Sequence, residues 1–166
     1  MRLQAPQPLA ERHSTAGFDC GDDSLNQWLQ QRALANQRSG ATRTFVVCCA
    51  DGVVKAYVAL ASGAVAVAAS PGRFRRNMPD PIPVVVLARL AVCRSLQGQG
   101  IARALLADAF ERVLMASEQI GVRGLVVHAA SPAAREFYLH MGFDPSPSDP
   151  NMLLLRLVDI AATLKG

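Results

Sequence analysis

The residues best suited to chemistry in this sequence lie where an apolar run gives way to glycines. Leu90-Ala-Val92 ends the run, and Gln97-Gly-Gln-Gly100 leads into Ile101 and Ala102, where a helical pattern begins. Glycine permits positive φ angles and close approach of the backbone. The N–H groups of such a loop and of the helix start carry partial positive charge, so the segment predicts a diphosphate site.

Two other phosphate-binding patterns fit this segment less well. A Walker A loop requires Gly-Lys-Ser/Thr, which the sequence lacks. A dinucleotide fingerprint requires a third glycine and an acidic residue at the end of the next strand. Here Gly100 is followed by Ile-Ala-Arg103, and the next expected strand leads into His128-Ala-Ala130.

Hydrophobic periodicity and turn residues predict the elements that must position this loop. Strands are expected at 44–49, 54–61, 84–92, 125–129 and 152–157, with a further one at 64–69. Helices are expected at 23–36, opened by a capping box at Ser24–Gln27; from Ile101 to Gly121; from Ser131 and Pro132 to Gly142; and after Asp159. The segment 73–83 is expected to be a basic loop. This order predicts one α+β domain over residues 1–166 with a mixed sheet.

The pattern Leu90-x-Val92 followed by Gln97-x-x-Gly100-x-Ala102 resembles the acetyl-coenzyme A motif of the GNAT acetyltransferases. Ala133-Ala-Arg-Glu-Phe-Tyr138-Leu-His-Met-Gly142-Phe143 is similar to the second signature of that family. The resemblance implies the GNAT fold, in which helices flank a mixed, mostly antiparallel sheet. It also implies an N-acetyltransferase that uses acetyl-coenzyme A as co-substrate and needs no metal.

The same resemblance implies roles for individual residues. The backbone of Leu90, Ala91 and Val92 would pair with the pantetheine arm. Backbone N–H groups would hold the pyrophosphate from Gln97, Gly98, Gln99, Gly100, Ile101 and Ala102. Arg103 would add a cation there, and Ser131 and Arg135 would contact the pantetheine or adenosine end. Ser131 also suits the N-cap of its helix without any ligand.

Tyr138 matches the position of the family's general acid. Attack of an amine on the thioester expels a thiolate, which a nearby phenol can protonate. The alternative is a purely packing role, because Tyr138 shares a helix face with Phe137 and Met141.

The N-terminal half narrows the resemblance. Phe18-Asp-Cys20-Gly, Ser24-Leu-Asn26-Gln-Trp-Leu29 and the run from Arg76 to Val92 resemble GNAT toxins of bacterial toxin–antitoxin pairs. That likeness implies acetylation of the α-amino group of aminoacyl-tRNA, a block in translation, a ribbon-helix-helix antitoxin and a homodimer. Apolar segments at 153–155 and 160–164 suit either a dimer interface or the core.

Charge and the scarcity of carboxylates agree with a tRNA substrate. The formal net charge is +4, and 15 of the 17 cations are arginine, which suits either phosphate binding or a bias in composition. Arg73, Arg75 and Arg76 could grip tRNA phosphates, although a short basic loop also aids solubility. Between Phe45 and Ser95 the only acidic residues are Asp51 and Asp80. A site poor in bases suits an α-amine, whose pKa is near 7.7–8.0, better than a lysine amine near 10.4. It would suit a small amine of low pKa equally well.

Other functions remain open on this reading. The protein could acetylate a protein N-terminus or a small-molecule amine, or it could be an inactive GNAT-fold binding protein. A nucleic-acid-binding module without chemistry fits poorly, because the sequence shows no helix-turn-helix, zinc or RNA-sheet signature. Four cysteines without a C-x-x-C pair, no signal-peptide design and no long apolar run favour a cytoplasmic protein without a membrane span.

Overall fold

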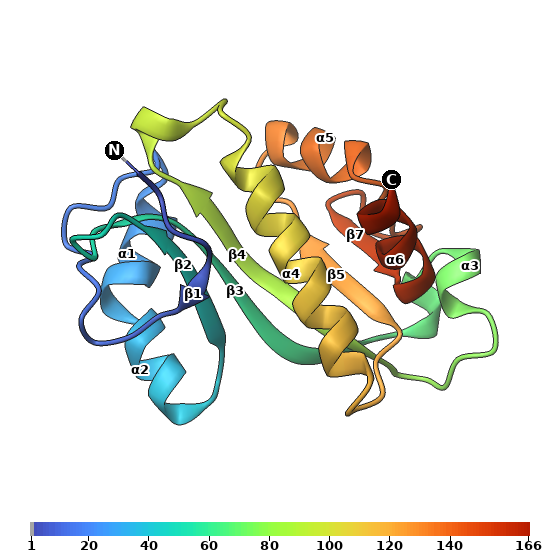
Figure 1. The fold of residues 1–166 in the computed structure, drawn as a ribbon. Coiled ribbons are helices and arrows are strands. Elements are labelled where there is room, and N and C mark those ends of the chain that lie inside the picture. The colour runs from blue at the N-terminus through green and yellow to red at the C-terminus, as the bar shows by residue number, and fades with distance from the viewer. Residues whose placement is uncertain (1) are drawn as a thin grey trace. The chain divides into compact units, whose positions relative to one another are not determined.

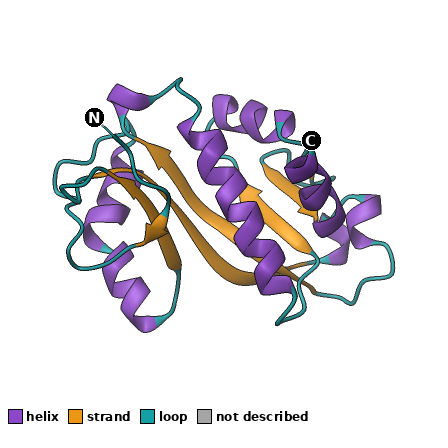
Figure 2. Ribbon diagram, viewed as in Figure 1, coloured by secondary structure: helices purple, strands orange, loops and turns teal. Residues whose placement is uncertain are grey.

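The computed structural model describes residues 2–166, with the helices and strands shown in Figures 1 and 2. The strands are β1 (Gln7–Pro8), β2 (Arg43–Cys48), β3 (Val54–Val65), β4 (Ile82–Val92), β5 (Gly124–His128), β6 (Asp144–Pro145) and β7 (Met152–Arg156). The helices are α1 (Asp23–Gln31), α2 (Ala33–Ser39), α3 (Gly72–Arg75), α4 (Ile101–Ser117), α5 (Pro132–His140) and α6 (Leu157–Lys165).

The strands form a seven-stranded sheet in the order β1-β2-β3-β4-β5-β7-β6. β4 and β5 pair in parallel, whereas β1–β2, β2–β3, β5–β7 and β6–β7 are antiparallel pairs. The predicted α+β class with a mixed, mostly antiparallel sheet is therefore confirmed. None of the helices in residues 2–166 is long and apolar enough to cross a membrane.

The chain divides into two compact units. The first contains Met1–Ala61 and Ala88–Ala109, and the second contains Ser62–Leu87 and Phe110–Gly166. β3, β4 and α4 each contribute residues to both units. The expectation of a single domain over residues 1–166 stays a prediction.

The first unit is built on the hairpin of β2 and β3, in agreement with the two strands expected at 44–49 and 54–61. Its register shifts between Val47 and Cys48, and β1 adds a short strand at the edge of β2. Tyr57 lies at the centre of the core, with its ring stacked 5.9 Å from that of Trp28 and its hydroxyl donating to the Leu25 carbonyl at 2.7 Å. The buried core residues are Leu9, Phe18, Leu29, Ala33, Val46, Val54, Tyr57, Ala91 and Cys93.

The helical part of this unit differs from the prediction. The N-cap of α1 is Asp22, whose carboxylate accepts the N–H groups of Ser24 and Leu25, so the capping box assigned to Ser24 is wrong. Ser24 instead donates its hydroxyl to Asp22 at 2.7 Å. The single helix expected at 23–36 is two helices, because Arg32 leaves helical geometry at φ −121°.

The second unit places β5 beside both β4 and β7. Its buried core residues are Phe74, Ile82, Val84, Val126, Met152 and Leu154. Leu153, Leu154 and Leu155 are at most 2% exposed, and Ile160 is fully buried. These apolar residues therefore belong to the core, which was one of the two readings open for them.

Two segments of this unit correct the sequence reading. Within 64–69, β3 ends at Val65 and Val67–Ala69 is a 3-10 turn whose first N–H donates to the Asp80 carboxylate. The segment 73–83 is not a loop throughout, because α3 forms around Phe74, which is only 1% exposed. β4 also begins earlier than expected, and α4 ends at Ser117, ahead of Gly121.

Candidate active site

The glycine loop, residues 97–100, leads into the start of α4. A 3-10 turn at Arg94–Leu96 precedes it. Gly98 and Gly100 have φ angles of 80° and 83°, in the left-handed region that strains other residues. A Cβ atom built on either glycine would meet nothing within 4 Å. The backbone is therefore open to a ligand at both positions.

The N–H groups of this loop are available to a ligand. The Gln97 N–H, which the resemblance placed against the pyrophosphate, instead donates to the Arg94 carbonyl at 3.4 Å. Among the hydrogen bonds of residues 2–166, none has an N–H group of residues 98–103 as its donor. The first helical bond of α4 runs from the Ala104 N–H to the Gly100 carbonyl at 3.1 Å. The unpaired N–H groups of a helix start carry partial positive charge. This segment can therefore donate several hydrogen bonds to the oxygens of a diphosphate.

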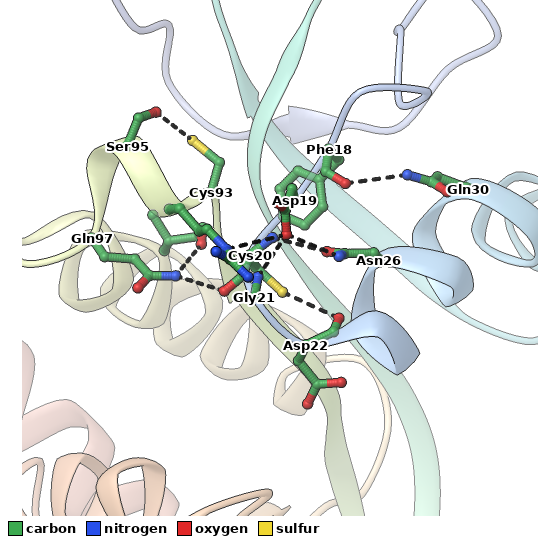
Figure 3. A network of polar contacts seen from close by, with 12 residues as sticks. Phe18, Asp19, Cys20, Gly21, Asp22, Asn26, Gln30, Cys93, Ser95 and Gln97 are labelled. Atoms are coloured by element: carbon green, nitrogen blue, oxygen red, sulfur yellow. Dashed lines mark hydrogen bonds and ion pairs between the residues drawn. The ribbon is translucent and has the colours of Figure 1, made fainter.

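The polar side chains of the loop differ in what they contact. Gln97 turns toward the protein, where its Nε2 donates to the carbonyls of Cys20 at 2.8 Å and Val92 at 2.9 Å (Figure 3). Gln99 donates to the Ser95 carbonyl at 3.4 Å. Arg103 is exposed at the start of α4 and could add a cation to a bound anion.

Three predicted site residues lie on α5 or at its N-cap, in the second unit. Ser131 is the N-cap, because its hydroxyl accepts the Ala134 N–H at 3.1 Å. The Arg135 Nε donates to the Pro150 carbonyl at 2.6 Å, so part of its guanidinium is engaged within the protein. Tyr138 lies on the same helix, near its C-terminal end.

Tyr138 is held by aromatic packing. It is 5% exposed, and its ring lies 5.2 Å from Phe137 and 5.4 Å from Phe143, edge-on to both. Burial raises the pKa of the phenol above its ordinary value, so the hydroxyl keeps its proton at neutral pH. No hydrogen bond found in residues 2–166 uses this hydroxyl. The side chain therefore combines a fixed ring with a proton that it can donate.

The basic cluster lies on and directly after α3. Arg73 pairs with the Asp144 carboxylate at 2.5 Å, which raises the pKa of the guanidinium. Arg75 and Arg76 are exposed, and none of the hydrogen bonds or ion pairs given by the described residues involves their guanidinium groups. Arg75 and Arg76 are therefore the members of the cluster that are free to meet a phosphate.

The two carboxylates between Phe45 and Ser95 accept hydrogen bonds from backbone N–H groups. Asp51 accepts the Val53 N–H at 3.0 Å, and Asp80 accepts the Val67 N–H at 3.1 Å. Across residues 2–166, no group of three or more His, Cys, Asp or Glu side chains could hold a metal ion.

The structure gathers the predicted residues in two places. Leu90–Arg103 form one continuous segment in the first unit, while Arg135 and Tyr138 lie on α5 and Ser131 at its N-cap in the second. The sequence reading gave no role to Asp19 and Asn26, which bond to one another. The Asp19 carbonyl also accepts the Arg94 N–H of the turn before the loop. The only signal for Asp19 and Asn26 was the pair of short blocks, Phe18–Gly21 and Ser24–Leu29, that resemble the GNAT toxins.

Known proteins resemble this chain over nearly its full length. Residues 41–145 match the family model described as acetyltransferase (GNAT) domain. A tRNA-acetylating toxin of Mycobacterium tuberculosis is 47% identical over 160 residues, which cover 96% of each chain.

Solved structures agree in fold. AtaT complexed with acetyl-methionyl-tRNAfMet has a TM-score of 0.89 at 32% identity, covering 97% of this chain and 98% of that one. AtaTR bound with AcCoA has a TM-score of 0.83 at 32% identity and 96% coverage of both chains. A mutant AtaT bound to the C-terminus of the antitoxin AtaR has a TM-score of 0.83 at 28% identity, covering 99% of each chain.

These likenesses confirm the predicted GNAT fold and the resemblance to GNAT toxins. The chain belongs to the GNAT family of acetyltransferases.

Proposed function

We propose that this protein is a toxin that transfers the acetyl group of acetyl-coenzyme A to the α-amino group of an aminoacyl-tRNA and so blocks translation. The observation that carries the proposal is the 47% identity, over 96% of both chains, to a tRNA-acetylating toxin. The AtaT structures with acetyl-methionyl-tRNAfMet and with AcCoA support the same pair of substrates.

Acetyl-coenzyme A fits the glycine loop. Its diphosphate would accept hydrogen bonds from the free N–H groups of residues 98–103, with Arg103 adding positive charge. The backbone of Leu90–Val92 would pair with the pantetheine arm. Ser131 can still donate its hydroxyl proton while it caps α5, and Arg135 would use the part of its guanidinium that does not bind Pro150.

Tyr138 is the general acid of the proposed reaction. The amine nitrogen attacks the thioester carbonyl, a C–N bond forms, and the C–S bond breaks when the tetrahedral intermediate collapses. The departing sulfur takes the Tyr138 proton, and the amine gives its own proton to water. The raised pKa of the buried phenol keeps that proton available at neutral pH.

The scarcity of carboxylates between Phe45 and Ser95 favours an α-amine as the acceptor. Asp51 and Asp80 are committed to turns. An α-amino group with a pKa near 7.7–8.0 already has an appreciable free-base fraction at neutral pH, so water suffices as the proton acceptor. Arg75 and Arg76, exposed and free of carboxylates, would hold tRNA phosphates.

The same proposal includes partners and a location. A ribbon-helix-helix antitoxin would neutralise the enzyme, and the AtaT structure with the C-terminus of AtaR supports an antitoxin of some kind. The toxin would act as a homodimer in the cytoplasm, where charged tRNA is found.

Labelled acetyl-CoA tests the acceptor directly. The protein is incubated with it and with total tRNA that is either charged or deacylated, and the tRNA is then precipitated and counted. We expect label in charged tRNA alone. Label on a protein N-terminus or a small amine, with none in charged tRNA, would support the rival acetyltransferase function and reject this one. Failure to bind acetyl-CoA at all would favour an inactive binding protein.

A further inference from the structure

The segment Asp19–Asn26, called here the anchor segment, forms a closed hydrogen-bonded turn beside the glycine loop. Asn26 is 8% exposed and uses both ends of its carboxamide, accepting the Cys20 N–H at 2.9 Å and donating to the Asp19 carboxylate at 3.2 Å. The Asp19 carboxylate also accepts the Gly21 N–H at 2.9 Å. These bonds fix the direction of the Cys20 carbonyl.

The anchor segment is hydrogen-bonded to the 3-10 turn Arg94–Leu96, which leads into the glycine loop (Figure 3). The Arg94 N–H donates to the Asp19 carbonyl at 2.9 Å, and the Arg94 Nε lies 3.4 Å from the Asp19 carboxylate. The Gln97 Nε2 reaches both the Cys20 carbonyl at 2.8 Å and the Val92 carbonyl at 2.9 Å. One carboxamide therefore ties the end of β4, the loop entrance and the anchor segment together.

The glycines explain why the loop entrance needs to be held in place. Gly98 follows Gln97 directly and Gly100 lies three positions after it, and no Cβ limits the backbone of either glycine. A free loop of this kind would lose conformational entropy each time it bound a diphosphate. Fixing its entrance removes part of that loss before the ligand arrives, which is preorganisation.

We propose that Gln97 is a positioning residue for acetyl-CoA and that the anchor segment forms part of the cofactor site without touching the cofactor. The inference rests on the proposed function, because it assumes that the loop binds the diphosphate of acetyl-CoA. It gives the Gln97 side chain a role of its own, the orientation of the N–H groups that follow it, whereas the sequence reading gave a role only to the Gln97 backbone.

Gln97→Glu is the variant that tests this role. It keeps the size of the side chain but places a carboxylate oxygen against two carbonyl oxygens. Gln30→Glu is the matched control, because the Gln30 Nε2 also bridges two carbonyls, those of Ala16 at 3.3 Å and Phe18 at 3.2 Å, and contacts no loop residue. Asn26→Asp is a second test variant, which removes the donor to Asp19 and leaves the acceptor.

The readout compares ligands with and without the diphosphate. Affinity for CoA is measured by calorimetry, and kcat/KM is measured for acetyl transfer to charged tRNA from acetyl-CoA and from S-acetylpantetheine. We expect Gln97→Glu and Asn26→Asp to lose about tenfold or more with CoA and acetyl-CoA, or about 1.4 kcal/mol. With S-acetylpantetheine, which lacks the diphosphate, both should stay within about twofold of the parent enzyme, as Gln30→Glu should with either donor.

Each other outcome overturns the inference. An equal loss with both donors would mean a general structural role, and no loss would mean that the tie is dispensable. If Gln97→Glu does not fold, as judged by circular dichroism, Gln97→Met takes its place with the same expectation. If the parent protein fails to bind CoA, the proposed function fails and this inference with it. CoA binding that the variants retain in full removes the inference alone.

Discussion

Replacing Tyr138 by phenylalanine removes one hydroxyl and leaves the rest of the ring. The ring is 5% exposed and packs edge-on against Phe137 and Phe143 at 5.2 and 5.4 Å. Because no hydrogen bond in residues 2–166 uses the hydroxyl, the substitution breaks none. We therefore expect the free energy of unfolding to change by less than about 1 kcal/mol.

The effect on the rate should be far larger. A positioned general acid contributes about 10²–10⁴-fold, which corresponds to about 2.7–5.5 kcal/mol of the activation barrier. We expect kcat of Tyr138→Phe to fall within that range. The dissociation constant of CoA should stay within about twofold, because phenylalanine preserves the packing of the ring.

Single-turnover acetylation of charged tRNA and CoA calorimetry measure the two effects separately. Tyr57→Phe is the control, since its hydroxyl donates to the Leu25 carbonyl in the core of the first unit. That variant should lose about 1 kcal/mol of stability and keep its kcat. An undiminished rate in Tyr138→Phe would remove the acid role, and a loss of CoA affinity equal to the loss of rate would mean that the hydroxyl serves binding.

Three further predictions concern the acceptor, the fold and the pH profile. The double variant Arg75→Glu, Arg76→Glu should raise KM for charged tRNA by about tenfold and weaken the dependence of that KM on salt concentration, while CoA affinity is unchanged. The control Arg38→Glu, at another exposed arginine, should change neither KM nor its salt dependence. An unchanged KM of the double variant in filter-binding and kinetic assays would exclude the proposed phosphate contacts. Gly124→Ala should cost about 3 kcal/mol or more in urea unfolding, because its Cβ would lie 2.1 Å from the Leu155 carbonyl oxygen, and a stable variant would contradict this packing. The rate should rise with pH through about 8, as the α-amine loses its proton. It should not fall again below about pH 10, because burial raises the pKa of the Tyr138 phenol above its ordinary value. A rise in rate set by a group with a pKa near 6 would reveal a base.

Patterns within one element were readable from the sequence. The glycine loop followed from residue types alone, because positive φ at Gly98 and Gly100 and a helix start are local properties. The Ser131 N-cap and the stop at Gly142, with φ of 98°, are local in the same way. The turn residues at 50–52 likewise marked the hairpin of the first unit.

Contacts between distant segments were not readable. Gln97 reaches Cys20 across 77 positions, and Arg73 pairs with Asp144 across 71. No periodicity links such residues, so neither the anchor segment nor the loss of Arg73 from the free cations could be foreseen. A local signal can also be ambiguous. Both Asp and Ser suit the N-cap of a helix, and in α1 the N-cap is Asp22 and not Ser24.

A strand that is buried on both faces is also hard to interpret from sequence, because its residues do not alternate between apolar and polar. Residues 153–155 are three consecutive leucines, which carry no alternation to separate a core strand from an exposed interface. Their position in β7, between β5 and β6, resolves this in favour of the core.

The central claim is that the acetyl group ends on the α-nitrogen of an amino acid attached to tRNA. Charged tRNA treated with the protein and acetyl-CoA can be digested with nuclease, and the released aminoacyl-adenosine can be fragmented in a mass spectrometer. We predict an acetyl group on the α-nitrogen of the aminoacyl fragment, absent when acetyl-CoA is omitted. Unmodified aminoacyl-adenosine, together with acetylated protein N-termini or small amines in the same reaction, would contradict the account.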